Sequence, residues 1–198
     1  MNKVNVIIAD AGQIAASYEE IISGIPQYYA ARYHRIRRRQ EADQELAAGY
    51  LLRQYLGVGS DDQLIRGEHG KPELRSGEVY FNLSHSGAYV VLAIADVDIG
   101  VDIEKVMAVH WPTVRKVFSR RQQELLEGTP EPEQPLQFTR LWTEREAELK
   151  LLGTGFAVDH EPGDGRTVRS IRYKEYMITC AAYEQFEITF IQCPGPQR

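Results

Sequence analysis

Apolar and polar residues alternate along several short stretches of the chain, which is the pattern of half-buried strands. Residues 4–10 (VNVIIAD) are rich in β-branched side chains and predict a first strand. In the middle of the chain, residues 79–87 and 89–96 predict a strand, a turn and a second strand, and residues 98–106 (DIGVDIEKV) predict another. The tail predicts three more strands joined by short turns, at residues 167–173, 175–183 and 185–193.

Three longer segments instead repeat their apolar residues with the period of a helix. They cover residues 41–56, 112–127 and 136–152, and each stops before a glycine, at Gly57, Gly128 and Gly153. A proline-rich linker, TPEPEQP, separates the second helix from the third. Both halves of the chain therefore combine helices with an antiparallel meander, and the predicted fold class is α+β.

The composition is that of an ordinary globular protein, with 43% hydrophobic and 26% charged side chains among 198 residues. A net charge of −5 argues against a dedicated nucleic-acid-binding protein, because no overall positive field would attract phosphates. The longest uncharged apolar run, residues 88–95, is too short to span a bilayer, and the first residues lack a signal-peptide core. We therefore expect a cytoplasmic protein without a membrane partner, in which Cys180 and Cys193 are free thiols.

Two carboxylates, Asp102 and Glu104, interrupt an otherwise apolar predicted strand. Strand side chains repeat every two residues, so both are expected on the same face. Adjacent carboxylates repel each other unless a cation lies between them or one takes up a proton. Carboxylate oxygens are the ligands that Mg²⁺ prefers, whereas a solvated strand end with Glu104 paired to Lys105 would explain the same pattern without a metal.

The third predicted helix carries Glu146 and Lys150 four residues apart, hence on one face. An ordinary surface salt pair explains most pairs of this kind. The functional alternative makes Glu146 a further metal ligand or a general base, with Lys150 as a phosphate contact beside it.

Other segments offer groups suited to an anion. Ser84, His85 and Ser86 fall where a predicted strand ends before Gly87, and a turn of this kind presents hydroxyls and backbone N–H groups, although the same residues also simply cap hairpins. The segment ARYHRIRRR holds a run of arginines beginning at Arg32, and GKP places Lys71 in a tight turn. Arginine forks suit phosphate, but such a run is also typical of a solvated helix face.

Taken in order, the segments GKP, FNLSHSG, IGVDIE, VFSRRQQELL and LWTEREAELKLLGTG resemble the signature motifs of the 4′-phosphopantetheinyl transferases. They are most similar to the monomeric, two-subdomain type that activates peptide and polyketide synthetases. The resemblance covers residues 70–155, and the strand YMITCAAY also resembles the last core strand of that family.

The resemblance implies a fold and an activity. The fold is a pseudo-twofold pair of similar subdomains, each a helix packed on a small antiparallel sheet, with residues 1–98 on the coenzyme A adenine and 3′-phosphate side and residues 99–198 carrying the metal carboxylates. The activity is Mg²⁺-dependent transfer of 4′-phosphopantetheine from coenzyme A to a serine of an apo acyl or peptidyl carrier protein, with release of 3′,5′-ADP. A monomer is expected.

The resemblance also assigns roles to individual residues. It places Asp102, Glu104 and Glu146 as Mg²⁺ ligands and Lys150 near the pyrophosphate of coenzyme A, with Glu146 and Lys150 as the catalytic pair. It places Lys71, Ser84, His85 and Arg32 at the phosphate and adenine end of coenzyme A.

Two positions depart from the family pattern. Arg145 stands where the family usually has a lysine, and it is predicted to keep the contact to coenzyme A with a planar fork in place of a compact ammonium. Gln44 stands where the family usually has a basic residue. These departures leave open a non-catalytic relative that only binds coenzyme A or a carrier protein. An Mg²⁺-dependent phosphohydrolase that shares the carboxylates is a further alternative.

Carrier proteins are usually acidic, so a basic docking surface is expected in spite of the acidic isoelectric point. The predicted helix around residues 114–126 is the candidate, because it carries Arg115, Lys116, Arg120 and Arg121. A solvated helix face remains the alternative.

Overall fold

The structure is a computed structural model that describes residues 1–67, 70–153 and 165–196. Three sheets are present in this part of the chain. The first contains β4 (Tyr80–Ser86), β5 (Tyr89–Ala95), β1 (Asn2–Asp10) and β9 (Phe186–Gln192), in that order. The second is a small hairpin of β2 (Leu64–Arg66) and β3 (Pro72–Leu74), and the third contains β6 (Gly100–Lys105), β8 (Tyr176–Ala182) and β7 (Thr167–Tyr173).

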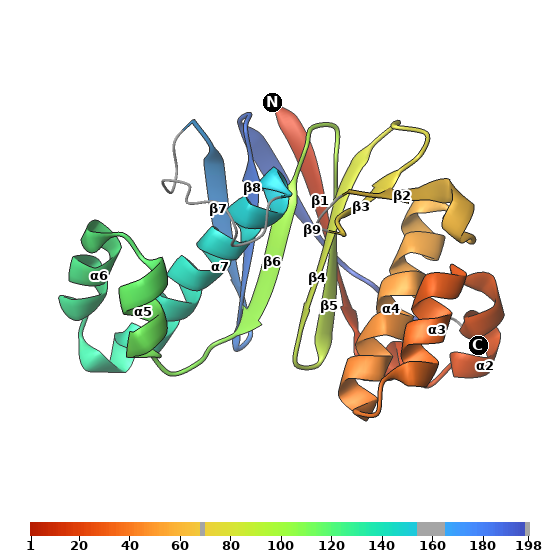
Figure 1. The fold of residues 1–198 in the computed structure, drawn as a ribbon, viewed down its shortest axis with the longest axis horizontal. Coiled ribbons are helices and arrows are strands. Elements are labelled where there is room, and N and C mark those ends of the chain that lie inside the picture. The colour runs from red at the N-terminus through yellow and green to blue at the C-terminus, as the bar shows by residue number, and fades with distance from the viewer. Residues whose placement is uncertain (68–69, 154–164, 197–198) are drawn as a thin grey trace.

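Helices cover the outer faces of the two larger sheets (Figure 1). On the β1 sheet these are α1 (Ala11–Ala15) and α4 (Arg39–Leu56), whereas α3 (Gln27–Arg35) packs on α4 and the short α2 (Tyr18–Ile21) lies beside them. On the β6 sheet the long helix α7 (Gln134–Leu152) lies against β6 and β8, and α5 (Trp111–Val117) and α6 (Arg120–Glu127) pack on its first half. The structure thus confirms the predicted α+β class, with helices and antiparallel pairing in both halves.

The core is divided into layers by the two sheets. One cluster, which includes Ile7, Leu46, Leu51 and Leu92, fills the space between α4 and the β1 sheet. A second cluster lies between the two sheets and takes the opposite face of β1, with Val6, together with Ile103 of β6 and Ile178 of β8. Burial on both faces explains why β1 and β8 read as nearly continuous apolar runs.

One strand departs from the predicted division of the chain. The sequence predicts the last strand as part of a C-terminal meander within residues 99–198, but β9 pairs in parallel with β1 of the first sheet. β6 and β7 occupy both edges of β8, so β9 cannot continue the meander beside β8, and it pairs instead with the edge of β1 that β5 leaves open. The C-terminal strand therefore completes the N-terminal sheet.

The second predicted helix is also corrected, because it is two helices. Phe118 is extended (φ −90°, ψ 142°) between α5 and α6. Ser119 then starts α6 with a capping box, in which its side chain accepts from the backbone N–H of Gln122 and the Gln122 side chain accepts from the backbone N–H of Ser119. The periodicity is continuous across the break, so only the Ser-x-x-Gln signature could have indicated it.

Among the described residues, no helix is long and apolar enough to cross a membrane.

Candidate functional site

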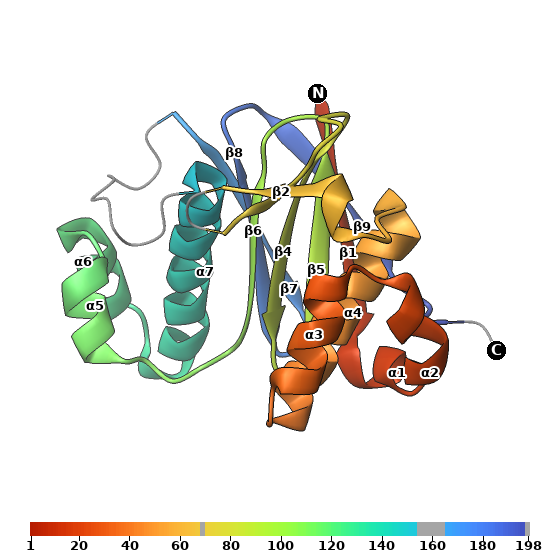
Figure 2. The same ribbon diagram turned by 45° about the vertical axis from the view of Figure 1, so that its right-hand side comes forward.

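β4 and β6 run side by side between α4 and α7 in both views of the molecule (Figures 1 and 2). No backbone ladder joins them; instead, side chains of β4 accept from alternate backbone N–H groups of β6. The three pairs are Asn82 Oδ1 with Val101 N (3.0 Å), Ser84 Oγ with Ile103 N (3.3 Å) and Ser86 Oγ with Lys105 N (3.2 Å). We call this line of contacts between β4 and β6 the seam.

Asp102 lies at the centre of the seam and is 4% exposed. Its Oδ1 accepts from Ser84 Oγ at 2.8 Å and from Lys150 Nζ at 2.7 Å. Its Oδ2 is buried and has no hydrogen-bond partner. An orphaned buried carboxylate oxygen is unfavourable unless a cation or a water molecule satisfies it.

Glu104 lies two residues further along the same face of β6, as the strand period predicts. Ser86 Oγ donates to Glu104 Oε2 at 2.7 Å. Burial raises the pKa of Glu104, and the charge of Asp102 raises it further. The two carboxylates therefore already repel each other in this structure.

α7 brings Glu146 and Lys150 to this face because it approaches β6 very closely at Gly100. A Cβ placed on Gly100 would lie only 2.0 Å from the backbone oxygen of Ala147 and 2.5 Å from the backbone nitrogen of Leu151. Only a residue without a side chain permits this contact, which explains the glycine in the IGVDIE segment. The helix ends directly afterwards at Gly153, whose φ is +64°.

Glu146 has a strongly raised pKa, mainly because it is buried. Its pKa is raised to about 7, first by burial and then by the charges of Asp102 and Glu104, while Lys150 opposes the shift. A carboxyl group with this pKa is partly protonated near neutral pH, because burial disfavours its charged form and the neighbouring carboxylates add to that effect.

The site fits a hard divalent cation by the chemistry of its donors. Asp102, Glu104 and Glu146 supply carboxylate oxygens only, the donor type that Mg²⁺ prefers, and the orphaned Asp102 Oδ2 offers a ligand without rearrangement. Within the described ranges, no three acidic, histidine or cysteine side chains are yet gathered around one point. Lys150 supplies a positive charge there instead, through its contact with Asp102.

The residues predicted to contact coenzyme A divide into two groups. Lys71 and Arg32 are each held by an acidic partner, because Lys71 Nζ lies 2.8 Å from Asp98 Oδ1 and Arg32 Nη2 lies 2.6 Å from Glu45 Oε1. Sequence reasoning missed both acidic partners. Asp98 follows Lys71 by 27 positions and Glu45 follows Arg32 by 13, and no local pattern links residues at these separations.

Ser84 and His85 are adjacent on β4 but lie in different surroundings. Ser84 is 6% exposed and occupied by the seam, which leaves its hydroxyl no hydrogen to offer a phosphate. His85 is exposed, and it lies near Glu45, Arg32, Lys150 and Asp102. Desolvation by the surrounding protein lowers the pKa of His85, and Glu45 counteracts that shift.

The two departures from the expected motifs are both buried. Arg145 of α7 is 8% exposed, and its charge lowers the pKa of Glu146. Gln44 of α4 is 5% exposed, and its Nε2 donates to the backbone oxygen of Gly87 at 2.8 Å. Gln44 therefore supports the turn that follows His85.

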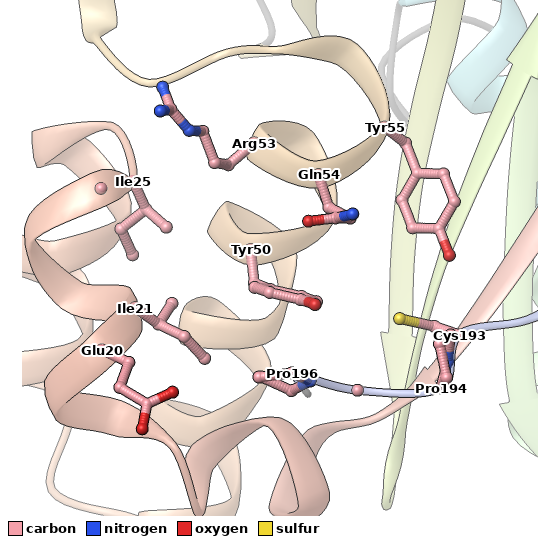
Figure 3. A pocket seen from close by; sticks show the side chains of 12 residues that line it. Glu20, Ile21, Ile25, Tyr50, Arg53, Gln54, Tyr55, Cys193, Pro194 and Pro196 are labelled. Atoms are coloured by element: carbon pink, nitrogen blue, oxygen red, sulfur yellow. The ribbon is translucent and has the colours of Figure 1, made fainter. Parts of the chain in front are cut away.

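A cavity of about 630 Å³ lies away from the seam, between α4 and the segment after β9 (Figure 3). Tyr50, Tyr55 and Cys193 line it, together with Glu20 and Arg53. It lacks the cluster of carboxylates that the seam carries. The chemistry of the molecule therefore gathers at the seam and not in this cavity.

Comparison with known proteins finds a family that resembles part of this chain. Residues 98–187 match the model of the 4′-phosphopantetheinyl transferase superfamily. The matched region contains Asp102 and Glu104 of β6 and also Glu146 and Lys150 of α7. This part of the chain, a little under half of its length, is therefore similar to the superfamily.

Several curated members of the superfamily are similar to the chain. The 4′-phosphopantetheinyl transferase Sfp of Bacillus subtilis strain 168 is 32% identical over 125 residues, which cover 63% of this chain and 54% of that protein. The transferase psf-1 of Bacillus pumilus is 37% identical over 90 residues, 45% of this chain and 39% of that protein. The transferase ffp of Bacillus subtilis is 28% identical over 157 residues, 76% of this chain and 69% of that protein.

The chain thus spans about half the length of Sfp and somewhat less of psf-1. Lys71, Ser84, His85 and Arg32 lie outside the region that the superfamily model matches. The superfamily match therefore covers the segment that carries the carboxylates, and the roles of all these residues stay predictions.

Proposed function

We propose that the protein transfers the 4′-phosphopantetheine group of coenzyme A to a serine of an apo acyl or peptidyl carrier protein, with Mg²⁺ as the metal. The observation that carries this proposal is the grouping of Asp102, Glu104, Glu146 and Lys150 at the seam, within the region similar to the superfamily. Phosphoryl-type transfer needs positioning and charge neutralisation more than covalent help from the enzyme, and this group of residues offers both.

The carboxylates and the lysine would have different roles. Asp102, Glu104 and Glu146 would hold Mg²⁺, which supplies positive charge to the pyrophosphate of coenzyme A. Lys150 Nζ, now on Asp102 Oδ1, is the protein's own cation at the same place and would contact the pyrophosphate.

The transfer itself is a substitution at phosphorus. The serine oxygen of the carrier bonds to the β-phosphorus of coenzyme A, and the bond from that phosphorus to the bridging oxygen of 3′,5′-ADP breaks. The serine proton passes to Glu146, directly or through a water molecule.

The 3′-phosphate and adenine end of coenzyme A would lie toward Lys71, His85 and Arg32. His85 is exposed and accessible to a phosphate, whereas Lys71 and Arg32 would have to share their present carboxylate partners with it. Arg145, buried beside Glu146, would act on the pyrophosphate side mainly through its charge.

The acidic carrier protein would dock on α5 and α6. Arg115, Lys116, Arg120 and Arg121 are all exposed there, and Leu125 (52% exposed) adds an apolar contact. Arg120 already pairs with Glu124, so the face is less basic than its arginine count indicates. We propose that the protein works as a monomer, since one chain supplies residues on both sides of the seam.

Intact-mass spectrometry of an apo carrier protein tests the proposal. The carrier is incubated with this protein, coenzyme A and Mg²⁺, and a mass gain of one phosphopantetheine group that EDTA abolishes is the expected result. Release of inorganic phosphate without modified carrier would instead indicate a phosphohydrolase. Binding of coenzyme A without either product would indicate a non-catalytic relative.

A further inference from the structure

Two serine hydroxyls of the seam have a second contact that edge pairing alone does not require. Ser84 Oγ accepts from the backbone N–H of Ile103 and donates to Asp102 Oδ1. Ser86 Oγ accepts from the backbone N–H of Lys105 and donates to Glu104 Oε2. Each serine therefore holds the backbone on one side of a carboxylate residue and the carboxylate itself at the same time.

The spacing makes this arrangement regular. Each contact between a β4 serine and a β6 backbone N–H joins residues 19 positions apart, and each contact to a carboxylate joins residues 18 apart. β4 and β6 thus run in the same direction and in register, so one serine of β4 meets one carboxylate of β6 at each two-residue step. In the sequence, this pairing corresponds to polar residues at every second position of FNLSHS, in the pattern Asn-x-Ser-x-Ser.

Asn82 shows that the edge of β6 can be satisfied without touching a carboxylate. Its Oδ1 accepts from the N–H of Val101, and the residue that precedes Val101 is Gly100, which has no side chain to orient. Among these three β4 residues, serine occurs only at the two positions that face a carboxylate of β6. A hydroxyl is the simplest side chain that accepts from a backbone N–H and donates to a carboxylate through one atom.

The hydrogen-bonding capacity of Ser84 is used completely. A serine hydroxyl has one hydrogen to donate and two lone pairs to accept with. Ser84 donates to Asp102 Oδ1 and accepts from Ile103 N and from Lys150 Nζ (2.8 Å). Asp102 Oδ1 accepts both the hydroxyl and the ammonium hydrogen, and Asp102 Oδ2 is left without a hydrogen-bond partner.

We propose that Ser84 and Ser86 are positioning residues that orient Asp102 and Glu104 for a divalent cation. This inference rests on the metal site of the proposed function and assigns Ser84 a different task from the coenzyme A contact that its motif predicts. The same two hydroxyls also join β4 to β6, so the contact between the two sheets and the cation site would depend on the same residues.

The test measures cation affinity directly, without turnover. Mn²⁺ binding to the whole chain is followed by electron paramagnetic resonance, with and without coenzyme A, for the unaltered protein, Ser86→Ala and Ser86→Thr. Ser86 is chosen because it is only half-buried, and circular dichroism checks that each variant is folded. Ser170→Ala is the matched control, since Ser170 Oγ also donates to a glutamate of α7, Glu144 Oε1 at 3.3 Å, away from the seam.

We expect Ser86→Ala to raise the Kd for Mn²⁺ about 10-fold or more, as loss of a group that orients a ligand does at other metal sites. Ser86→Thr keeps the hydroxyl and should stay within about 3-fold of the unaltered protein, as should Ser170→Ala. Unchanged affinity in folded Ser86→Ala, or no Mn²⁺ binding by the unaltered protein in either condition, overturns the inference. Mn²⁺ binding that depends on Ser86 in a protein that modifies no carrier would sustain the inference and reject the proposed function.

Discussion

At the scale of single residues, the site is defined by an excess of negative charge. Asp102, Glu104 and Glu146 share one face, and Lys150 contacts Asp102 alone among these carboxylates in the described hydrogen bonds and ion pairs. The pKa of Glu146 is raised first by burial and then by the charges of Asp102 and Glu104. A group with a perturbed pKa beside charged partners is a common mark of a functional site.

The raised pKa of Glu146 predicts a pH-dependent stability in the absence of metal. The folded-state pKa of Glu146 is raised from 4.5 to about 7, so the folded protein holds a proton that the unfolded chain has lost between these values. Its contribution to stability is therefore full below about pH 4.5 and is lost as the pH rises through 7. In EDTA, Glu146→Gln should be more stable than the unaltered protein at pH 8, by about 1–2 kcal/mol after allowance for partial exposure, and equal to it near pH 4.5.

Denaturant unfolding at several pH values measures this difference. Glu144→Gln provides the control, because Glu144 lies on the same helix but contacts Arg140 and Ser170 of β7, outside the seam. A constant difference between Glu146→Gln and the unaltered protein from pH 5 to pH 8 would show that Glu146 does not titrate in this range.

At the scale of elements, the position of α7 on β6 decides whether the site exists. The contact at Gly100 brings backbone atoms of Ala147 and Leu151 within reach of a single added methyl group. The placement of Asp102 and Glu104 on one face could be predicted from the strand period, and that of Glu146 and Lys150 from the helix period. Their meeting could not, because it depends on α7 packing on β6 at one glycine, through residues more than 40 positions apart in the sequence.

We expect Gly100→Ala to destabilise the protein by about 1–3 kcal/mol and to lower turnover, because backbone atoms cannot move aside as a flexible side chain can. The shift of α7 should weaken the Mn²⁺ site as well. Gly24→Ala is a suitable control, since no heavy atom lies within 4 Å of a Cβ placed there. Chemical denaturation of the two variants decides the matter: equal stability would mean that the close approach at Gly100 is not required.

The paired helices α5 and α6 form the proposed docking element. Reversing the charges of Arg120 and Arg121 to Glu should raise the KM for the carrier protein and leave the KM for coenzyme A unchanged, because the helices lie away from β4. Arg169 and Arg172, two exposed arginines of β7, can be reversed in the same way as a control for net charge. If both KM values rise equally, or if the control raises the carrier KM as much, the carrier does not dock on this face.

At the scale of the whole molecule, the two sheets are held together by the crossover of β9 and by the seam. The apolar alternation of residues 185–193 indicates a strand but not its partner, because a strand pattern carries no information about which edge is free. The seam could not be predicted from the sequence either. The local sequence indicates that Ser84 is a turn residue, and its contact with Asp102 forms only when β4 and β6 lie side by side. Sequence motifs thus identify the charged residues, and the fold explains how they are held.

The most direct test of the account compares Glu146→Gln with Glu144→Gln, two variants that remove one negative charge from the same helix. Carrier modification is followed by intact mass at saturating coenzyme A over a range of Mg²⁺ concentrations. The account predicts that Glu146→Gln lowers turnover by about 100-fold or more and weakens the response to Mg²⁺, whereas Glu144→Gln stays within about 2-fold of the unaltered protein. Full turnover by Glu146→Gln with an unchanged Mg²⁺ requirement would contradict the assignment of the seam as the site of phosphopantetheinyl transfer.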